Sequence, residues 1–220
     1  MTLVKALGRA WPEDGARETP MIAKAKTPRR ILLVNGHPDP RPDRLCSALA
    51  SAYAEGASAA GHVVRRVDVG ALDLRPVGSQ ADFMAEAGPV VAELQQALRD
   101  SDHLVLIYPL WLGAPPAAFK AFLEQVFRYG VALSAPGTGK GLKGLLVGRS
   151  ARVIVTMGMP AFIFRLVFFS HGLKCVSRGV LWISGFRPIR ETALGPTEGR
   201  DPGQRLQWLA QMRRLGAAAA

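Results

Sequence analysis

A turn suited to holding an anionic group precedes the first long helical pattern of this sequence. The segment 36–46 reads GHPDPRPDRLC and joins the apolar run Ile31–Val34 to a helical pattern over about 43–60. The start of a helix presents amide N–H groups without intrahelical partners and the positive end of the helix dipole, so it suits phosphate. Arg44 adds a guanidinium with matching donor geometry. The alternative is an ordinary turn in which Asp43 caps the helix, and the dinucleotide fingerprint GxGxxG is missing here.

Aromatic and apolar residues fill a second loop, at the end of the predicted strand His103–Leu110. Residues 108–116 read YPLWLGAPP. Loops are ordinarily polar, so an apolar cluster at the end of a buried strand suits a flat ring system that also needs backbone amides. A contact with a neighbouring subunit explains the same residues, and both interpretations stay open.

A third loop, TMGMP at 156–160, overlaps the end of the predicted strand Arg152–Met157. Thr156 offers a hydroxyl, and the glycine two residues later allows a ligand to approach the backbone closely. His171 follows downstream, and its imidazole titrates near neutral pH, which suits a proton donor. A lone histidine is more often structural than catalytic, so both roles stay open for it.

The segment 134–141, SAPGTGKG, has a superficial likeness to a nucleotide P-loop. A P-loop needs Gly at its first position and Ser or Thr after the Lys, and it joins a strand to a helix. This segment has Ser134 and Gly141 at those positions, follows a helical pattern and precedes a strand. We therefore expect a flexible loop rather than a site for a nucleoside triphosphate.

Short apolar runs alternate with helical patterns along most of the chain. This order requires crossover connections, and therefore a doubly wound, mostly parallel α/β sheet with helices on both faces. Ligands of such sheets bind beyond the carboxyl ends of the strands, where the three loops lie. The predicted strands are 31–34, 63–69 (near an edge), 103–110, 152–157 and 179–184; the predicted helices are about 43–60, 90–99, 119–127 and 203–215, the last with Leu206, Leu209 and Met212 facing inward.

Composition excludes several classes of protein. The 220 residues are 49% hydrophobic and carry a formal net charge of +11. The basic residues are not interleaved with aromatic ones, so we expect no nucleic-acid partner. The longest apolar run falls short of the ~20 residues of a membrane span, and the two cysteines form no CxxC pattern. We expect a cytoplasmic protein with no transmembrane segment and no metal site.

The first residues differ from the rest in lacking a sustained apolar period. Residues 1–28 mix basic side chains with Glu13, Asp14 and Glu18, and they lack the apolar core of a secretory signal. We expect a flexible N-terminal extension over 1–28 and a single domain over 29–220, with Met21 as an alternative start of the chain.

Several of these segments together resemble a known family. NGHPDP from residue 35, YPLWLGAPPAAFKAFLEQVF from 108, ARVIVTMGMP from 151 and SHGLK from 170 resemble the flavodoxin-like NAD(P)H:quinone oxidoreductases in order and spacing. The PLWxGxPxxxK stretch is the most specific part. The resemblance implies a five-stranded parallel sheet in the order 2-1-3-4-5, a noncovalently bound flavin, and a homodimer whose active sites form at the subunit interface.

The resemblance also implies roles for particular residues. His171 falls close to the active-site histidine of the family, within one residue. The other residues fall into a phosphate loop, a segment along the flavin ring and a third flavin loop. The implied flavin-binding residues are His37, Arg44, Leu45 and Cys46; Pro109, Leu110, Trp111 and Leu112; and Thr156, Met157 and Gly158.

Two positions depart from the family pattern. Arg44 stands where many members have Ser or Thr, so we expect phosphate recognition by charge rather than by a hydroxyl. Phe164 stands where some members have a tyrosine. The implied reaction is ping-pong: NAD(P)H delivers hydride to the flavin and leaves, and a quinone or similar electrophile then takes two electrons. FMN is favoured over FAD because the chain is short. The alternatives are an ancillary subunit docking on a cation-efflux system and a non-enzymatic electron carrier, although such carriers are usually acidic.

Overall fold

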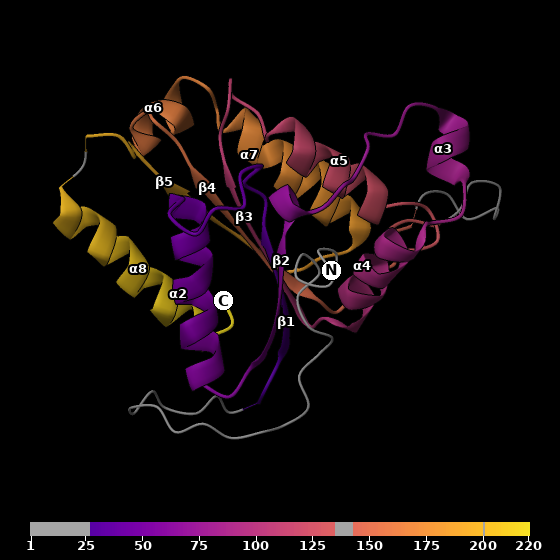
Figure 1. Ribbon diagram of the computed structural model, residues 1–220, viewed down its shortest axis with the longest axis horizontal. Coiled ribbons are helices and arrows are strands. Elements are labelled where there is room, and N and C mark those ends of the chain that lie inside the picture. Colours follow the sequence, from indigo (N-terminus) through magenta and orange to yellow (C-terminus); the bar gives the residue numbers. More distant parts are fainter. Residues whose placement is uncertain (1–26, 135–142, 200) are drawn as a thin grey trace.

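The computed structural model describes residues 27–134, 143–199 and 201–220. Nearly all of the predicted extension over 1–28, and all of the P-loop-like segment except Ser134, lie outside these residues. The described residues form a twisted sheet between two layers of helices (Figure 1).

The sheet has five parallel strands in the order β2-β1-β3-β4-β5. Both the parallel sheet and its order are therefore confirmed. Asn35 lies beside Ile107, and Pro109 lies beside Thr156, so the central strands end near the same edge. The strands are β1 (Arg30–Asn35), β2 (Val63–Asp68), β3 (His103–Pro109), β4 (Ser150–Thr156) and β5 (Ile189–Leu194).

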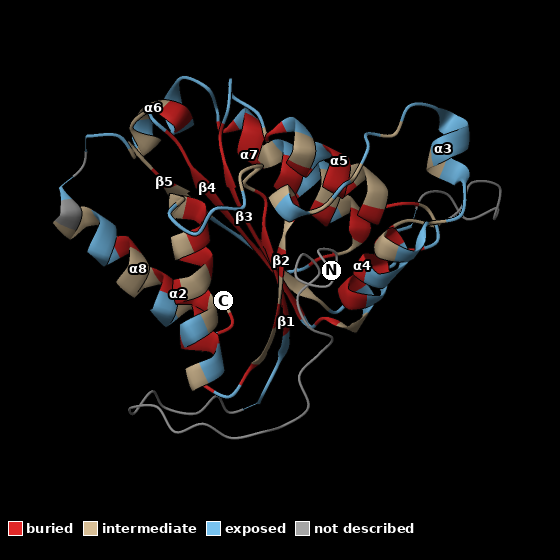
Figure 2. Cartoon of the chain, in the orientation of Figure 1, coloured by how far each residue is buried: buried red, intermediate tan, exposed pale blue. Residues whose placement is uncertain are grey.

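Helices cover both faces of the sheet because successive strand side chains point to opposite sides. Leu32 and Leu106 pack with α4, α5 and α7, whereas Ile31 and Ile107 pack with α2 and α8. Figure 2 shows the buried strands between these layers. The helices are α2 (Leu45–Ala59), α3 (Gln80–Met84), α4 (Pro89–Asp100), α5 (Ala117–Val126), α6 (Ala161–Leu166), α7 (His171–Val176) and α8 (Pro202–Ala217), with short turns η1 (Val69–Ala71) and η2 (Ser177–Trp182).

The prediction of a fifth strand over 179–184 was wrong. These residues lie in and just after η2, which continues α7, and the fifth strand is β5 further on. A short apolar run such as GVLWIS has no periodicity that separates a strand from a buried helical turn. The real strand reads IRETAL, and it lies at an edge of the sheet where exposed Arg190 and Glu191 hide the strand pattern.

The inward face of the last helix was predicted only in part. Met212 is fully buried and Leu209 packs against the core, as predicted, but Leu206 is 65% exposed. Trp208 takes the inward position instead. Leu206 lies in the first turns of α8, and Figure 1 shows that this part of α8 stands away from α2, whereas the later turns approach it.

Candidate functional site

The three loops singled out in the sequence meet at the carboxyl edge of the sheet. The amide of Gly36 donates to the carbonyl oxygen of Ile107 at 2.7 Å, and that of Leu110 donates to the carbonyl oxygen of Thr156 at 2.7 Å. Cys46 Sγ lies 3.4 Å from Thr156 Oγ1. Hydrogen bonds therefore tie the ends of β1, β3 and β4 together, as the topology requires.

The first loop leads into a helix start with unpaired donors. Arg44 is the N-cap residue of α2, and no side chain caps this end. In the described part of the chain, the amides of Leu45, Cys46 and Ser47 have no hydrogen-bond acceptor. The alternative in which Asp43 caps the helix is therefore wrong. Three amides and a helix dipole converge on a point that suits an anionic group.

Asp39 organises the charged side chains of the first loop. Its carboxylate accepts hydrogen bonds from Arg41 and from Arg44 Nε, the latter at 2.7 Å. Partial desolvation alone would raise the pKa of Asp39, but the amide and guanidinium of Arg41, with the charge of His37, hold it below its usual value. Arg44 is half-buried and lies beside the helix start, so an anion bound there meets a guanidinium already held in place.

His37 links the first loop to the second. The amide of Asp39 donates to His37 Nδ1 at 3.0 Å, and the His37 ring meets Trp111 edge-on with centroids 5.8 Å apart. Behind this loop, a Cβ on Gly70 would lie 2.1 Å from the carbonyl oxygen of Pro38. Only glycine lets η1 approach the loop so closely.

Cys46 and Thr156 face inward rather than toward the open edge. Both are buried, and they contact each other. Burial raises the pKa of the Cys46 thiol to about 11, although the hydrogen bond with Thr156 partly offsets this. Met157 is buried as well, whereas Gly158 is exposed. These residues support the loops from within, and Gly158 alone of the predicted third-loop residues reaches the surface.

The second loop is a tight hairpin turn with an apolar tip. Trp111 and Ala114 exchange two backbone hydrogen bonds of 3.0 Å each, and the residues between them, Leu112 (φ 49°) and Gly113 (φ 79°), are left-handed. Leu112 is fully exposed and Trp111 about half exposed, whereas Pro109 and Leu110 are buried. In the described part of the chain, the amides of Leu112 and Gly113 have no acceptor.

A cavity of about 380 Å³ opens beside this turn. It is mostly apolar, and His171 contributes its one ionisable group. Its lining residues are Leu112, Gly113, Met159, Phe164, Phe168 and His171. The structure therefore brings together the predicted site residues Leu112 and His171, and it adds Met159 and Phe168, which were not among the predicted site residues.

Close backbone contacts position His171 against the second loop. A Cβ on Gly172 would lie only 2.2 Å from the carbonyl oxygen of Gly113, and the Tyr108 hydroxyl donates to the Gly172 carbonyl oxygen at 3.2 Å. Phe169 and Ser170, just before His171, both have positive φ. The sequence analysis missed Tyr108 and Gly172 in this role. The glycine directly after the histidine was the signal available.

Exposed aromatic and aliphatic side chains are concentrated in the segment that contributes Phe164 and Phe168 to this cavity. They lie on α6 and the turn that follows it, and they are Phe162, Leu166, Val167, Phe168 and Phe169. An apolar surface of this kind marks an interaction site on most proteins.

The described ranges contain neither a membrane-spanning helix nor a metal-binding cluster. None of the helices there combines the length and apolar character that crossing a membrane demands. No cluster of three or more His, Cys, Asp or Glu side chains there has a geometry that could hold a metal ion.

Comparison with protein families and curated sequences gives consistent matches. A family model described as a flavodoxin-like fold matches residues 29–215. The chain is 32% identical over 83 residues to FMN-dependent NADH:quinone oxidoreductase 2 of Jannaschia sp. (strain CCS1), or 38% of each chain. It is 30% identical over 109 residues to an uncharacterized NAD(P)H oxidoreductase of Escherichia coli (strain K12), covering 47% of this chain and 55% of that one. The match spans well under two thirds of these relatives' own length.

Solved structures share the fold over most of their length. An NAD(P)H:quinone oxidoreductase from Methanothermobacter marburgensis superposes with a TM-score of 0.73 at 22% identity, covering 87% of this chain and 98% of that one. An FMN-dependent NADH-azoreductase from Bacillus anthracis, in complex with FMN, gives 0.69 at 14% identity, covering 86% and 97%. At these identities the likeness concerns the fold.

Proposed function

The chain belongs to the family of the flavodoxin-like fold, and from that premise we propose that it is an FMN-dependent oxidoreductase that passes hydride from NAD(P)H to a quinone or a similar electrophile. One observation carries the proposal: an uncapped helix start beside Arg44 and an apolar cavity beside His171 lie at the same sheet edge. The names of the matched relatives agree with it.

The donors of the first loop fit a flavin phosphate. The amides of Leu45, Cys46 and Ser47 would donate to its oxygens, and Arg44 would add a charged hydrogen bond. His37 and Asp39 hold this loop in shape. Recognition by charge replaces the hydroxyl that many members of the family use.

The second loop and the cavity fit a flat ring. Trp111 and Leu112 offer apolar surface, and the amides of Leu112 and Gly113 are available for polar atoms at the ring edge. Phe164 closes the cavity with a ring that has no hydroxyl. Bound FMN would supply the redox chemistry, accepting hydride from NAD(P)H and giving it to the acceptor in a ping-pong order.

His171 would act on the acceptor. It is exposed and lines the cavity, so a quinone entering there would meet its imidazole. His171 would donate a proton to the acceptor oxygen as electrons arrive, and the apolar walls would keep water away. Tyr108 is a positioning residue, because it holds the backbone next to His171.

We further propose a homodimer that covers the exposed apolar surface on α6 and the following turn. Phe162 and Phe169 are each about three-fifths exposed, and the Phe169 ring lies with its centroid 6.0 Å from that of His171. A second copy would bury them and complete the cavity wall. Sedimentation at micromolar concentration is expected to give a dimer, and a monomer of 23.6 kDa would contradict this part of the proposal.

The visible absorption spectrum of the purified protein tests the central proposal. We expect a yellow protein, or a colourless one that gains flavin absorbance changes when titrated with FMN. Chromatography of the heat-released cofactor then separates FMN from FAD. Failure to bind either flavin would exclude the proposed chemistry. Flavin binding without NAD(P)H oxidation in the presence of a quinone would favour an ancillary subunit or an electron carrier instead.

A further inference from the structure

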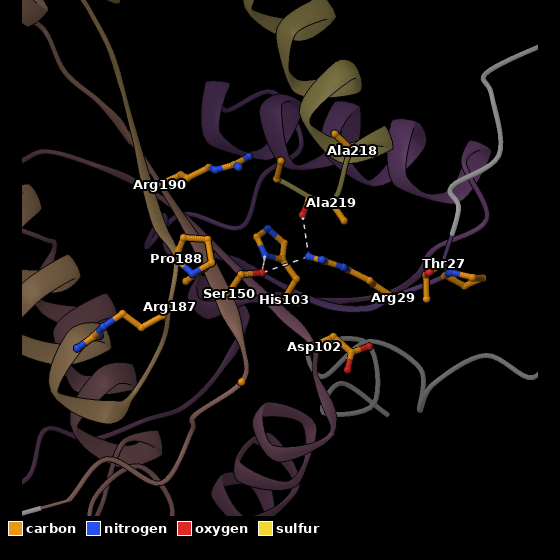
Figure 3. Close-up of a pocket in the computed structure, with 14 residues that line it drawn as sticks. Thr27, Arg29, Asp102, His103, Ser150, Arg187, Pro188, Arg190, Ala218 and Ala219 are labelled. Carbon is orange, nitrogen blue, oxygen red and sulfur yellow. Dashed lines mark hydrogen bonds between the residues drawn. The ribbon is translucent and has the colours of Figure 1, made fainter.

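A second, larger cavity lies at the opposite edge of the sheet. It measures about 590 Å³ and is lined where β1, β3, β4 and β5 begin and where α8 ends. Figure 3 shows Arg29 and Arg190 extending toward His103 from opposite sides. None of the residues of the carboxyl-edge site reaches it, so the proposed flavin chemistry leaves it unexplained.

The charges around this cavity are unbalanced. Arg29, Arg187 and Arg190 line it with a single acidic side chain, Asp102, whose carboxylate accepts a hydrogen bond from a backbone amide at 2.8 Å. Within the described ranges, none of the three arginines makes an ion pair. Behind them, buried Arg152 donates to Thr192 Oγ1 at 2.7 Å and, through Nε, to the main-chain oxygen of Ala220.

Arg29 and Arg190 remain available to a ligand, whereas Arg187 is already engaged. Arg187 lies over the Trp182 ring at 4.6 Å and donates to the carbonyl oxygens of Trp182 and Phe186. Arg29 makes only long contacts, 3.3 Å to Ser150 Oγ and 3.4 Å to the carbonyl oxygen of Ala219. Arg190 is exposed, and its side chain makes no hydrogen bond with the described residues.

His103 places an unpartnered ring nitrogen between Arg29 and Arg190. It is 1% exposed, and its Nε2 has no hydrogen-bond partner. Because Ser150 Oγ accepts from Arg29, its hydroxyl proton is free to point at His103 Nδ1, 2.8 Å away. With the Ser150 hydroxyl donating to Nδ1 in this way, the imidazole proton would sit on Nε2. Buried donors of native proteins normally have acceptors, so a missing acceptor is the simplest explanation.

Electrostatics at His103 agree with a site for an anion. Burial, followed by the charges of Arg29, Arg152 and Arg190, lowers the pKa of His103 to about 3. The imidazole is therefore neutral at physiological pH, and it feels the positive field of three guanidinium groups. A bound anion would reverse that field.

We propose that this cavity binds a compact multivalent oxyanion, held between Arg29 and Arg190 with His103 Nε2–H as a third donor. Its lining holds no aromatic side chain other than the His103 imidazole and is closed by Ala218, Ala219 and Ala220, so it offers no platform on which a nucleotide base would stack. Its volume exceeds that of one phosphate. The chemistry therefore points to a small molecule with two or three phosphate or carboxylate groups.

Calorimetric titration of the full-length, FMN-saturated protein with pyrophosphate, and separately with citrate, tests the proposal at constant ionic strength. Arg29→Gln and Arg190→Gln are each expected to weaken binding about tenfold or more, because each removes a charged hydrogen bond. Arg178→Gln, an exposed arginine outside the cavity, is the matched control and leaves binding unchanged. Binding of pyrophosphate alone, citrate alone or both identifies the anionic group.

The Arg44→Ala variant shows at which edge of the sheet the anion binds. It should lose anion binding only if the anion binds at the first loop, at the carboxyl edge. The imidazole resonances of His103, followed by NMR, give a second readout that does not depend on any variant. We expect them to shift on titration and the pKa of His103 to rise. No binding of either anion, an equal loss in Arg178→Gln, or an unmoved His103 signal would overturn the proposal, whatever the outcome for flavin.

Discussion

The two edges of the sheet have opposite chemistry. At the carboxyl edge, an apolar cavity of about 380 Å³ and an uncapped helix lie among exposed aromatic side chains. At the opposite edge, where the strands begin and which we call the amino edge, a cavity of about 590 Å³ is lined by arginines and small residues. Parallel strands send their connecting loops to both edges, yet only one edge follows the strand–loop–helix pattern from which function is usually inferred. The comparison teaches that the edge at which the strands begin can also carry a cavity with its own chemistry.

The largest expected effect concerns His171 at the carboxyl edge. His171→Ala should slow the acceptor half-reaction by about 10² or more, because it removes general-acid assistance, while leaving flavin content and melting temperature nearly unchanged. Rapid mixing that follows each half-reaction separately measures this. Lys174→Ala, on the same helix, is the control. Loss confined to the NAD(P)H half-reaction would place His171 beside the bound flavin ring, and no loss in either would make it structural.

Arg44 carries the next effect. Arg44→Ala should weaken FMN binding by about 1.5–3 kcal/mol, the range for a hydrogen bond to a charged group, with the fold intact. Fluorescence titration of the apoprotein measures the dissociation constant. Arg41→Ala is the matched control, since Arg41 also pairs with Asp39 but is far more exposed, and little change is expected. An unchanged affinity for Arg44→Ala would leave the backbone amides as the sole phosphate ligands.

Gly172 tests how the second loop holds His171. Gly172→Ala should destabilise the protein by about 1–3 kcal/mol, because the new Cβ collides with the Gly113 carbonyl, and should lower activity as well. Gly179→Ala is the control, because its Cβ would meet no atom within 4 Å. Urea unfolding measures both. Equal behaviour of the two variants would mean that the 111–114 turn yields without disturbing α7.

The amino edge contributes a dependence of stability on pH. His103 has a folded-state pKa of about 3 against an ordinary value of 6.5, so in that window the unfolded chain binds a proton that the folded chain excludes. The free energy of unfolding should therefore fall as pH falls from 6.5 toward 3, by at most about 1.4 kcal/mol per pH unit from this group. His103→Gln should lower the slope in urea unfolding between pH 6.5 and 4.5. Parallel slopes for both proteins would rule out this contribution.

The smallest effect separates the two cysteines. Cys46 is buried with a pKa raised to about 11, whereas Cys175 is exposed. Iodoacetamide at pH 8 should label Cys175 readily and Cys46 at least about 10² times more slowly, because the thiolate is the reactive form. Mass spectrometry of the Cys175→Ser and Cys46→Ser variants resolves the two sites. Rapid labelling of Cys46 would mean that the first loop opens away from Thr156.

Sequence reasoning predicted the sheet well where strands are buried on both faces. Ile31–Val34 is a continuous apolar run, and the predicted strand 103–110 contains another, Leu104–Ile107; such runs are typical of central parallel strands. It failed at β5, where an edge strand carries Arg190 and Glu191, and it assigned the apolar run 179–184 to a strand although the chain there is helical. The pattern of apolar residues along a segment indicates how far that segment is buried. Because an edge strand is less buried than a central one, its sequence lacks the apolar run that identifies a strand.

The same difference between local sequence pattern and tertiary packing applies to the candidate site. The sequence by itself determined which loops matter, because the alternation of strands and helices forces their ends to one edge and NGHPDP, PLW and TMGMP carry the resemblance. Only the tertiary structure decided which side chains face outward: Cys46 and Thr156 turn toward each other, while Phe168 and His171 share a cavity. It also decided that Arg29, His103 and Arg190, distant in sequence and outside every motif, meet at the amino edge. Side-chain direction and long-range proximity depend on how strands register and helices pack, and no local spacing encodes either.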